Sequence, residues 1–299
     1  IRQGRHTHDR DSITVLVAAD LWIAAGEAEN LERSTIKRYR ELSNLHIVPK
    51  FGALKLSQLT KAQVIEWRQE LLTAKSRSMA NKIIRALSAI LSNAMEIGAI
   101  SQNVASDVKV GRAKRDVEPP VRADLKKMIE AATDDERPFI LTAITTGLRS
   151  SELRGLCWRD IDLNAGTLTV RQRADQWGVM GSPKSEAGRR TIPLPPQLVV
   201  ELTKWKLRCK PTKIGLVFPS STGPALRHNN VLRRIYFPLQ VRAGLVVPKL
   251  DAKGKPLVDD EGNPIVTGKY RFHALRHAAA SGWIANKIDL KRLQVWIGH

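Results

Sequence analysis

Apolar residues recur at helical spacing through most of the first 110 residues of the chain. One continuous stripe at this spacing lies in segment 81–98 and consists of Ile83, Ile84, Leu87, Ile90, Leu91 and Ala94. In segment 59–72, Thr60 and Gln63 stand three residues apart, which is the arrangement of an N-terminal capping box. These patterns predict amphipathic helices, and we assign residues 1–110 to a helical domain.

Segment 111–121 interrupts this helical pattern. It is rich in arginine and lysine, contains the adjacent prolines Pro119 and Pro120, and shows no apolar periodicity. Such a composition is typical of a linker, so a second domain is expected from residue 122 to residue 299.

The second domain has a mixed pattern. Segments 123–132 and 137–147 have helical spacing, whereas β-branched residues in 166–173 and 189–195 predict two strands joined by a long loop. Segment 248–269 is rich in Gly, Pro and Asp and is expected to be an exposed hairpin, and no internal repeat is evident. The predicted fold is mainly α with a small antiparallel β-sheet in the second domain, an α+β class.

Lysine and arginine outnumber aspartate and glutamate by 49 to 29, which gives a formal net charge of +20. A surface this basic attracts polyanions and is typical of nucleic-acid-binding proteins, although ribosomal and heparin-binding proteins share it. The candidate contacts to a phosphate backbone are Lys37, Arg38, Arg40, Lys82, Arg85, Arg112, Lys114 and Arg115. Cys157 and Cys209 fit neither a zinc site nor a disulfide framework, and no apolar run is long enough to span a membrane.

A basic residue stands between two predicted helices in TTGLRSSEL, residues 145–153. Gly147 can end the first helix, Ser150 can cap the next one, and Glu152 lies in its first turn. Arg149 is then held on a short connection, where a guanidinium can bind two oxygens of one phosphate. The same position also suits an arginine that caps carbonyl groups at the end of the first helix.

Three further stretches carry cationic side chains. Lys184 lies in a loop of small residues between the predicted strands, where a lysine is usually just exposed to solvent, so a functional role needs further support. His273, Arg276 and His277 share one helix face, which suits an anion, a metal or a buried structural histidine; no Cys, Asp or Glu stands nearby at metal-ligand spacing. His299 follows a short predicted helix.

These stretches occur in the order and form found in the tyrosine recombinases, or phage-type integrases. TGLRSSEL, PKSEAGRRTIPL, HALRHAAASGW and LQVWIGH resemble the catalytic domain of that family and cover much of 137–299. Segment 35–60, TIKRYRELSNLHIVPKFGALKLSQLT, resembles the family's helical core-binding (SAM-like) domain. The resemblance implies a two-domain, C-shaped clamp on DNA and a site-specific recombinase that integrates or excises a mobile element such as a prophage.

The resemblance also implies roles for individual residues. The catalytic positions of the family fall on Arg149, Lys184, His273, Arg276 and His299, with Glu152 and His277 in supporting positions. The two arginines would bind the nonbridging oxygens of a DNA phosphodiester, and Lys184 would protonate the departing 5′ oxygen. His273 would transfer a proton near the nucleophile and His299 would donate a hydrogen bond to the phosphate. No metal or other cofactor is implied.

The nucleophile of the family has no counterpart in this sequence. It is a tyrosine that follows the motif ending at His299, and none of Tyr39, Tyr236 and Tyr270 stands at that position. We therefore expect the tyrosine that would form the 3′-phosphotyrosine intermediate to lie outside the 299 residues, so that this form binds DNA and does not cleave it.

The partners implied by the resemblance are double-stranded DNA at attachment sites and in Holliday junctions. The chain is expected to be a homotetramer on DNA, a monomer when free, and assisted by DNA-bending or excision factors in the cytoplasm, at the bacterial nucleoid or in a phage-infected cell. A type IB topoisomerase and a catalytically inert DNA-binding regulator of the same fold are the alternatives. A metal-dependent nuclease is disfavoured because no acidic metal cluster is evident.

Overall fold

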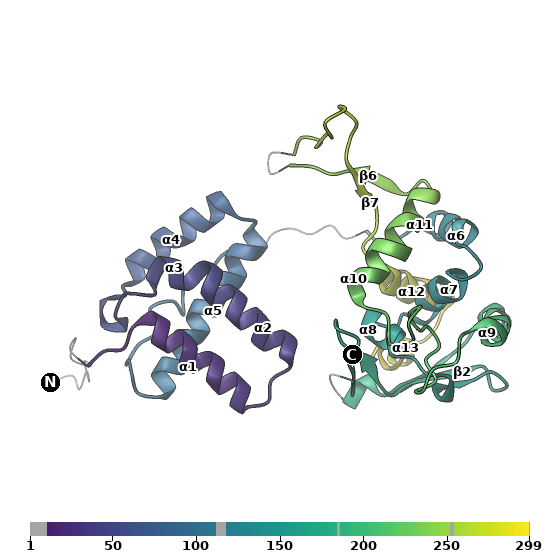
Figure 1. The fold of residues 1–299 in the computed structure, drawn as a ribbon, viewed down its shortest axis with the longest axis horizontal. Helices are drawn as coiled ribbons and strands as arrows, with labels where there is room; N and C mark the ends of the chain where they lie inside the picture. The colour runs from purple at the N-terminus through teal and green to yellow at the C-terminus, as the bar shows by residue number, and fades with distance from the viewer. Residues whose placement is uncertain (1–10, 112–117, 184–185, 252–253, 299) are drawn as a thin grey trace. The chain divides into compact units, whose positions relative to one another are not determined.

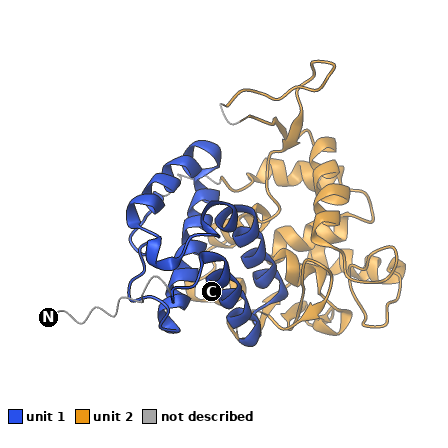
Figure 2. Ribbon diagram, turned by 60° about the vertical axis from the view of Figure 1, so that its left-hand side comes forward, with its two compact units in different colours: residues 1–116 blue, residues 117–299 orange. Residues whose placement is uncertain are grey.

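The structure is a computed structural model that describes residues 11–111, 118–183, 186–251 and 254–298. The chain divides into two compact units, residues 1–116 and 117–299, which are coloured blue and orange in Figure 2. Five residues singled out in the sequence lie outside the described residues, namely Arg112, Lys114, Arg115, Lys184 and His299.

Unit 1 is helical (Figure 1). Its helices are α1 (Val15–Ala28), α2 (Arg33–Leu42), α3 (Val48–Phe51), α4 (Lys61–Ala74) and α5 (Arg77–Glu96), with a π-helical turn at Ser43–Ile47 and a 3₁₀ turn at Leu56–Gln58. The predicted apolar stripe of segment 81–98 lies on α5, and all six of its members are buried in the core of the unit. The capping box is confirmed: Gln63 N–H donates to Thr60 Oγ1 (3.3 Å), and Thr60 N–H donates to Gln63 Oε1 (2.8 Å).

Unit 2 combines helices with small sheets. Its helices are α6 (Arg122–Ala131), α7 (Arg137–Thr146), α8 (Ser150–Arg154), α9 (Pro196–Arg208), α10 (His228–Asn230), α11 (Phe237–Arg242), α12 (Ala274–Ala285) and α13 (Leu290–Ile297), with 3₁₀ turns at Trp158–Asp160 and Glu186–Gly188 and a π-helical turn at Val231–Tyr236. Its strands are β1 (Ile161–Asp162), β2 (Thr167–Val170), β3 (Arg173–Ala174), β4 (Met180–Gly181), β5 (Arg190–Pro193), β6 (Val246–Pro248) and β7 (Val266–Gly268). The predicted fold class, mainly α with a small antiparallel sheet, is confirmed.

The largest sheet has the order β1-β2-β5, and both pairings are antiparallel. Leu168 on β2 lies opposite Ile192 on β5, and both side chains are fully buried in the core of unit 2. Because side chains alternate along a strand, Arg190 faces the same side as Ile192 and is also buried. The predicted pair of strands is confirmed, but the segment between them contains a further hairpin, β3–β4, where a loop was expected.

The predicted hairpin of segment 248–269 is confirmed as an arm that projects from unit 2 (Figure 1). Strands β6 and β7 pair at its base, with Pro248 opposite Val266. The arm contains an eight-residue repeat that begins at Pro248, Pro256 and Pro264, so the expectation of no internal repeat is wrong. The repeat is weak, because only the proline and the apolar residue two positions later recur at all three places, whereas the aspartate and the glycine recur only in the first two.

Candidate active site

Arg149 lies between α7 and α8, where the chain changes direction. Gly147 ends α7 in the left-handed conformation (φ 59°), and a Cβ atom there would lie 3.2 Å from Ala279 Cβ on α12. Glycine therefore satisfies both the backbone conformation and the close approach of α12. Arg149 follows in an extended conformation immediately before Ser150, so its side chain is held at the start of α8, as the sequence predicts.

Arg276 is buried on α12 and points to the same junction. One of its terminal nitrogens donates to the carbonyl of Gly147 (2.7 Å), and the other donates to the carbonyl of Ile297, at the end of α13. Arg149 donates to the carbonyl of Gly298 (3.1 Å), the residue that caps α13. The two arginines therefore meet at the ends of α7 and α13, although Arg276 lies more than 120 residues after Arg149 in the sequence.

A buried carboxylate lies behind the two arginines. Glu152 accepts a hydrogen bond from Arg149 (Nη1–Oε1, 2.8 Å) and two from Arg190 (3.1 and 2.7 Å). Burial by itself would raise the pKa of Glu152, but the hydrogen bonds and charge of Arg190, followed by those of Arg149, outweigh burial and lower it. Glu152 is therefore an anion that fixes two guanidinium groups in place.

The balance of charge at this junction favours an anion. Arg149, Arg190 and Arg276 carry three positive charges, against the single negative charge of Glu152. Burial, and then the charge of Arg149, lower the pKa of Arg276 to about 10, so it remains a cation at neutral pH. A phosphate placed beside Arg149 and Arg276 would relieve the repulsion that remains between these cations.

The two histidines of the same helix lie side by side. His273 precedes α12 and His277 lies one turn later, with their ring centroids 5.2 Å apart in an edge-to-face arrangement. Partial burial lowers the pKa of His273, and the charges of His277, Arg276 and Arg149 lower it further. His273 is therefore biased towards its neutral form, which can accept a proton.

Two predicted site residues, Lys184 and His299, lie outside the described residues, but their neighbours are close together. Gly298 caps α13 with φ 72°, and a Cβ atom there would lie 2.9 Å from the carbonyl oxygen of Ala187. Arg190 donates to the carbonyls of Gly188 and Trp296. The described segments near Lys184 and before His299 therefore meet beside the Glu152–Arg190 pair.

Sequence reasoning missed several residues that hold this junction together. Arg190 was not singled out, although its place on the inward face of β5 could be found from the alternation that buries Ile192. Arg154 is buried and donates to the carbonyls of Ser150, Ala174, Asp175 and Leu226, which ties α8 to two distant loops. Ser150 Oγ also lies 3.0 Å from Nδ1 of His228, and no local signal indicates this contact.

The candidate DNA contacts of unit 1 lie on helix surfaces. Lys37, Arg38 and Arg40 are exposed on α2, where Lys37 pairs with Glu41 (3.8 Å) and Arg40 pairs with Glu27. Lys82 and Arg85 are exposed on α5. Arg85 also lines a groove of about 730 Å³ together with polar residues that include Asn81, Ser88, Ser92 and Lys109.

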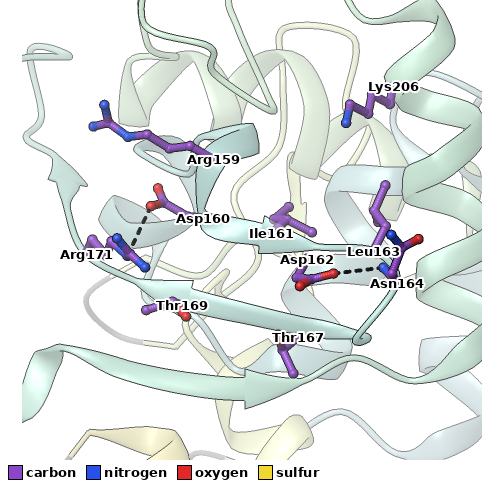
Figure 3. Close-up of a pocket in the computed structure, with 10 residues that line it drawn as sticks. All are labelled: Arg159, Asp160, Ile161, Asp162, Leu163, Asn164, Thr167, Thr169, Arg171 and Lys206. Carbon is purple, nitrogen blue, oxygen red and sulfur yellow. Dashed lines mark hydrogen bonds and ion pairs between the residues drawn. The ribbon is translucent and has the colours of Figure 1, made fainter.

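Unit 2 also contains a polar pocket of about 600 Å³ beside β1 and β2 (Figure 3). Its lining residues are Arg159, Asp160, Ile161, Asp162, Leu163, Asn164, Thr167, Thr169, Arg171 and Lys206. Burial raises the pKa of Asp160, whose Oδ1 lies 3.6 Å from Nε of Arg171. Of the predicted catalytic residues, the three that the structure describes, Arg149, His273 and Arg276, do not line this pocket, so it is separate from the junction of Arg149 and Arg276.

Neither a metal centre nor a membrane span is found in the described part of the chain. No group of three or more His, Cys, Asp or Glu side chains could hold a metal ion there. No described helix is both long enough and apolar enough to cross a membrane.

Comparison with known families identifies the fold. Residues 122–299 match the phage integrase family, and residues 18–72 match the N-terminal SAM-like domain of phage integrases. The chain belongs to the phage integrase family. The predicted resemblance is thereby confirmed.

Proteins named as integrases and tyrosine recombinases align with most of this chain. It is 27% identical to an integrase of Streptomyces ambofaciens, over 96% of this chain and 73% of that protein. It is 24% identical to a XerC-like tyrosine recombinase of Caldanaerobacter subterraneus subsp. tengcongensis, over 82% of this chain and 66% of that protein.

Solved integrase structures share the fold. The Tn1549 transposon integrase in complex with a circular intermediate DNA superposes with a TM-score of 0.76 at 19% identity, covering 96% of this chain and 92% of that one. A lambda integrase tetramer bound to a Holliday junction superposes with a TM-score of 0.72 at 18% identity, covering 96% and 78%.

Proposed function

We propose that this phage integrase family member is a site-specific DNA recombinase that breaks and rejoins DNA through a 3′-phosphotyrosine intermediate. The observation that carries the proposal is the meeting of Arg149 and Arg276 at one junction, braced by the buried pair of Glu152 and Arg190. Family membership and the likeness to integrases solved with DNA support it.

The two arginines are suited to hold a phosphodiester while charge builds on it. Each terminal nitrogen of Arg276 carries two N–H groups, so one on each remains for a ligand after Gly147 and Ile297 are bound. Arg149 is more than a third exposed, which leaves part of its guanidinium accessible. In our proposal both donate to the nonbridging oxygens and stabilise the pentacovalent transition state.

Proton transfer is assigned to the remaining positions. In the proposed mechanism, neutral His273 accepts a proton near the nucleophile, in keeping with its lowered pKa. Lys184 protonates the departing 5′ oxygen and His299 donates a hydrogen bond to the phosphate. His277, in edge contact with His273, holds that ring in position. These fixed cations and proton donors supply the charge stabilisation for which other nucleases use a metal ion.

The tyrosines of this chain support a nucleophile from outside the 299 residues. Tyr236 is buried with its hydroxyl 3.5 Å from the carbonyl of Arg271, and Tyr270 is buried with its hydroxyl 2.7 Å from Asp124 Oδ2. Tyr39 stacks on Trp22 in the core of unit 1. Because each ring has a structural role away from the junction of Arg149, we infer that the attacking hydroxyl comes from elsewhere.

Double-stranded DNA is the proposed partner, with several copies of the chain assembled on paired attachment sites. The lambda integrase tetramer on a Holliday junction supports such an assembly, and DNA-bending or excision proteins are proposed as accessory factors. The exposed Lys37, Arg38 and Arg40 on α2 are proposed to contact the DNA backbone. Lys82 and Arg85 on α5 are the other proposed backbone contacts of unit 1.

A nicked suicide substrate carrying the attachment site tests the proposal. The chain extended after His299 by a segment that supplies the tyrosine is expected to form a covalent adduct through a 3′-phosphotyrosine, without added metal. The 299-residue chain is expected to bind the same DNA and form no adduct. A metal-dependent cut or a 5′-linked adduct would overturn the proposal, and binding without any adduct would favour an inert regulator. Exchange between two sites, rather than relaxation alone, excludes a type IB topoisomerase.

A further inference from the structure

The arm of unit 2 contains two full copies of an eight-residue repeat and the start of a third. Proline begins each copy at positions 248, 256 and 264, and an exposed apolar residue follows two positions later. These apolar residues are Leu250, Val258 and Val266. The first two copies also place an aspartate next, at Asp251 and Asp259, and a glycine three residues after it, at Gly254 and Gly262.

The repeat closes on itself through its backbone. Lys249 N–H donates to the carbonyl of Ile265 (2.7 Å), Leu257 N–H to that of Lys249 (2.7 Å), and Ile265 N–H to that of Leu257 (2.8 Å). Each full copy also closes a turn, the first between Asp251 and Lys255 and the second between Asp259 and Asn263. In the second turn, Asp259 N–H donates to the carbonyl of Asn263 (2.9 Å), and Asp259 Oδ1 accepts from Asn263 N–H (2.8 Å). The arm is therefore a hydrogen-bonded module and not an irregular loop.

This module presents apolar side chains to solvent. Leu250 and Val258 are 54% and 56% exposed, and Val266 and Ile265 are 37% and 39% exposed. Their backbone is already ordered by the three-way hydrogen bonding, so a partner that covered them would not have to order the arm first. Exposed apolar residues repeated along a projecting element are typical of a protein-binding surface.

The charge of one turn of the arm, between Asp259 and Asn263, indicates what kind of partner it fits. Its second turn carries Asp259, Asp260 and Glu261, and no lysine or arginine among the described residues pairs with them. The same three residue types recur at 134–136, where Asp135 pairs with Arg208 and Glu136 pairs with Arg242. The acidic turn of the arm is thus left unneutralised in a chain whose net charge is +20.

We propose that this arm docks on a second copy of the chain bound to the same DNA. An acidic turn is repelled by a phosphate backbone, whereas it complements the basic surface of a neighbouring copy. The exposed Leu250 and Val258 would provide the buried contacts of that interface. This inference rests on the proposed function only in that DNA brings the two copies together.

Photo-crosslinking tests the contact directly. Val258→p-benzoylphenylalanine in the 299-residue chain is irradiated with and without a random-sequence duplex long enough for two copies. The expected product is a covalent pair of chains that forms with the duplex and is much weaker without it. A crosslink to DNA, a crosslink within one chain, or no two-chain product in either condition would each overturn the proposal.

Cooperative binding provides the second test. The double variant Leu250→Ser with Val258→Ser is expected to leave the affinity of the first copy for the duplex unchanged. The affinity of the second copy for the same duplex is expected to fall about tenfold. A shortened arm, with Asn-Gly joining Pro248 to Val266, keeps the base pairing of β6 and β7 and is expected to act in the same way.

The matched control is Val200→Ser, which removes a similarly exposed valine (54%) from α9. It is expected to change the affinity of neither the first nor the second copy for the duplex. Unchanged cooperativity in both arm variants would overturn the proposed contact. A chain that pairs through its arm but never forms a phosphotyrosine adduct when extended beyond His299 would instead overturn the proposed function.

Discussion

Glu152 and Arg190 form a buried ion pair in which Oε2 and Nη2 lie 2.7 Å apart and the side chains are 3% and 1% exposed. The same carboxylate binds Arg149, so one buried anion positions an arginine of the candidate site and ties it to β5. Removing one member of a buried pair leaves the other uncompensated, which makes this pair the structural support of the junction.

Arg190→Met is expected to destabilise the protein by about 3–5 kcal/mol, because Glu152 would remain buried without its main partner. Urea unfolding followed by circular dichroism measures the change. Arg189→Met, at the exposed neighbouring position, is the matched control and should have little effect. Equal stability of the two variants would show that the pair does not support the fold.

Arg149→Ala and Arg276→Ala are each expected to slow cleavage at least about a hundredfold, the usual cost of losing one donor to a developing charge. DNA binding should be largely retained, because many other cations are proposed to contact the DNA backbone. Single-turnover cleavage by the extended chain and gel-shift titration measure the two effects separately. Parallel loss of binding and cleavage would count against the assignment of these arginines to the scissile phosphate.

DNA affinity is expected to fall steeply with salt, by about a thousandfold between about 50 mM and about 200 mM, if six or more phosphates are contacted. Fluorescence anisotropy at several salt concentrations measures the slope. Arg85→Ala should make the slope of log affinity against log salt concentration shallower by about one, because one phosphate contact is lost. A flat salt response would contradict backbone binding by the basic surfaces of this chain.

His228 is expected to make stability depend on pH. Burial, and then the charge of Arg154, lower its pKa below the ordinary value of 6.5, so the folded protein favours the neutral ring. Its contribution is therefore fully present above pH 6.5 and is lost as pH falls towards the lowered pKa, where the unfolded chain binds a proton more readily.

The free energy of unfolding should thus be smaller at about pH 5.5 than at about pH 7.5. Urea titration at the two pH values measures it. His228→Asn should reduce this difference, although the lowered pKa values of His273 and His46 preserve part of it. An unchanged pH dependence in the variant would rule out His228 as a contributor.

Local features of the structure were predictable from the sequence because they depend on neighbouring residues. The capping box of Thr60 and Gln63 follows from residue type and spacing alone. Gly147 ends α7 as predicted, since only a residue that tolerates a positive φ fits that position.

Contacts between distant segments were not predictable in the same way. The hydrogen bonds of Arg276 with Gly147 and Ile297 depend on how α12 packs against α7 and α13, which no local pattern encodes. Arg190 escaped notice because a basic residue at the start of a strand is usually exposed, and its burial depends on Glu152.

The most direct test is an experimental structure of the chain bound to DNA that contains a scissile phosphate. The account predicts that Arg149, Lys184, His273, Arg276 and His299 all lie within hydrogen-bonding distance of that one phosphate. Side chains distributed over separate phosphates, or an Arg149 and an Arg276 still bound only to Glu152 and to backbone carbonyls, would contradict it.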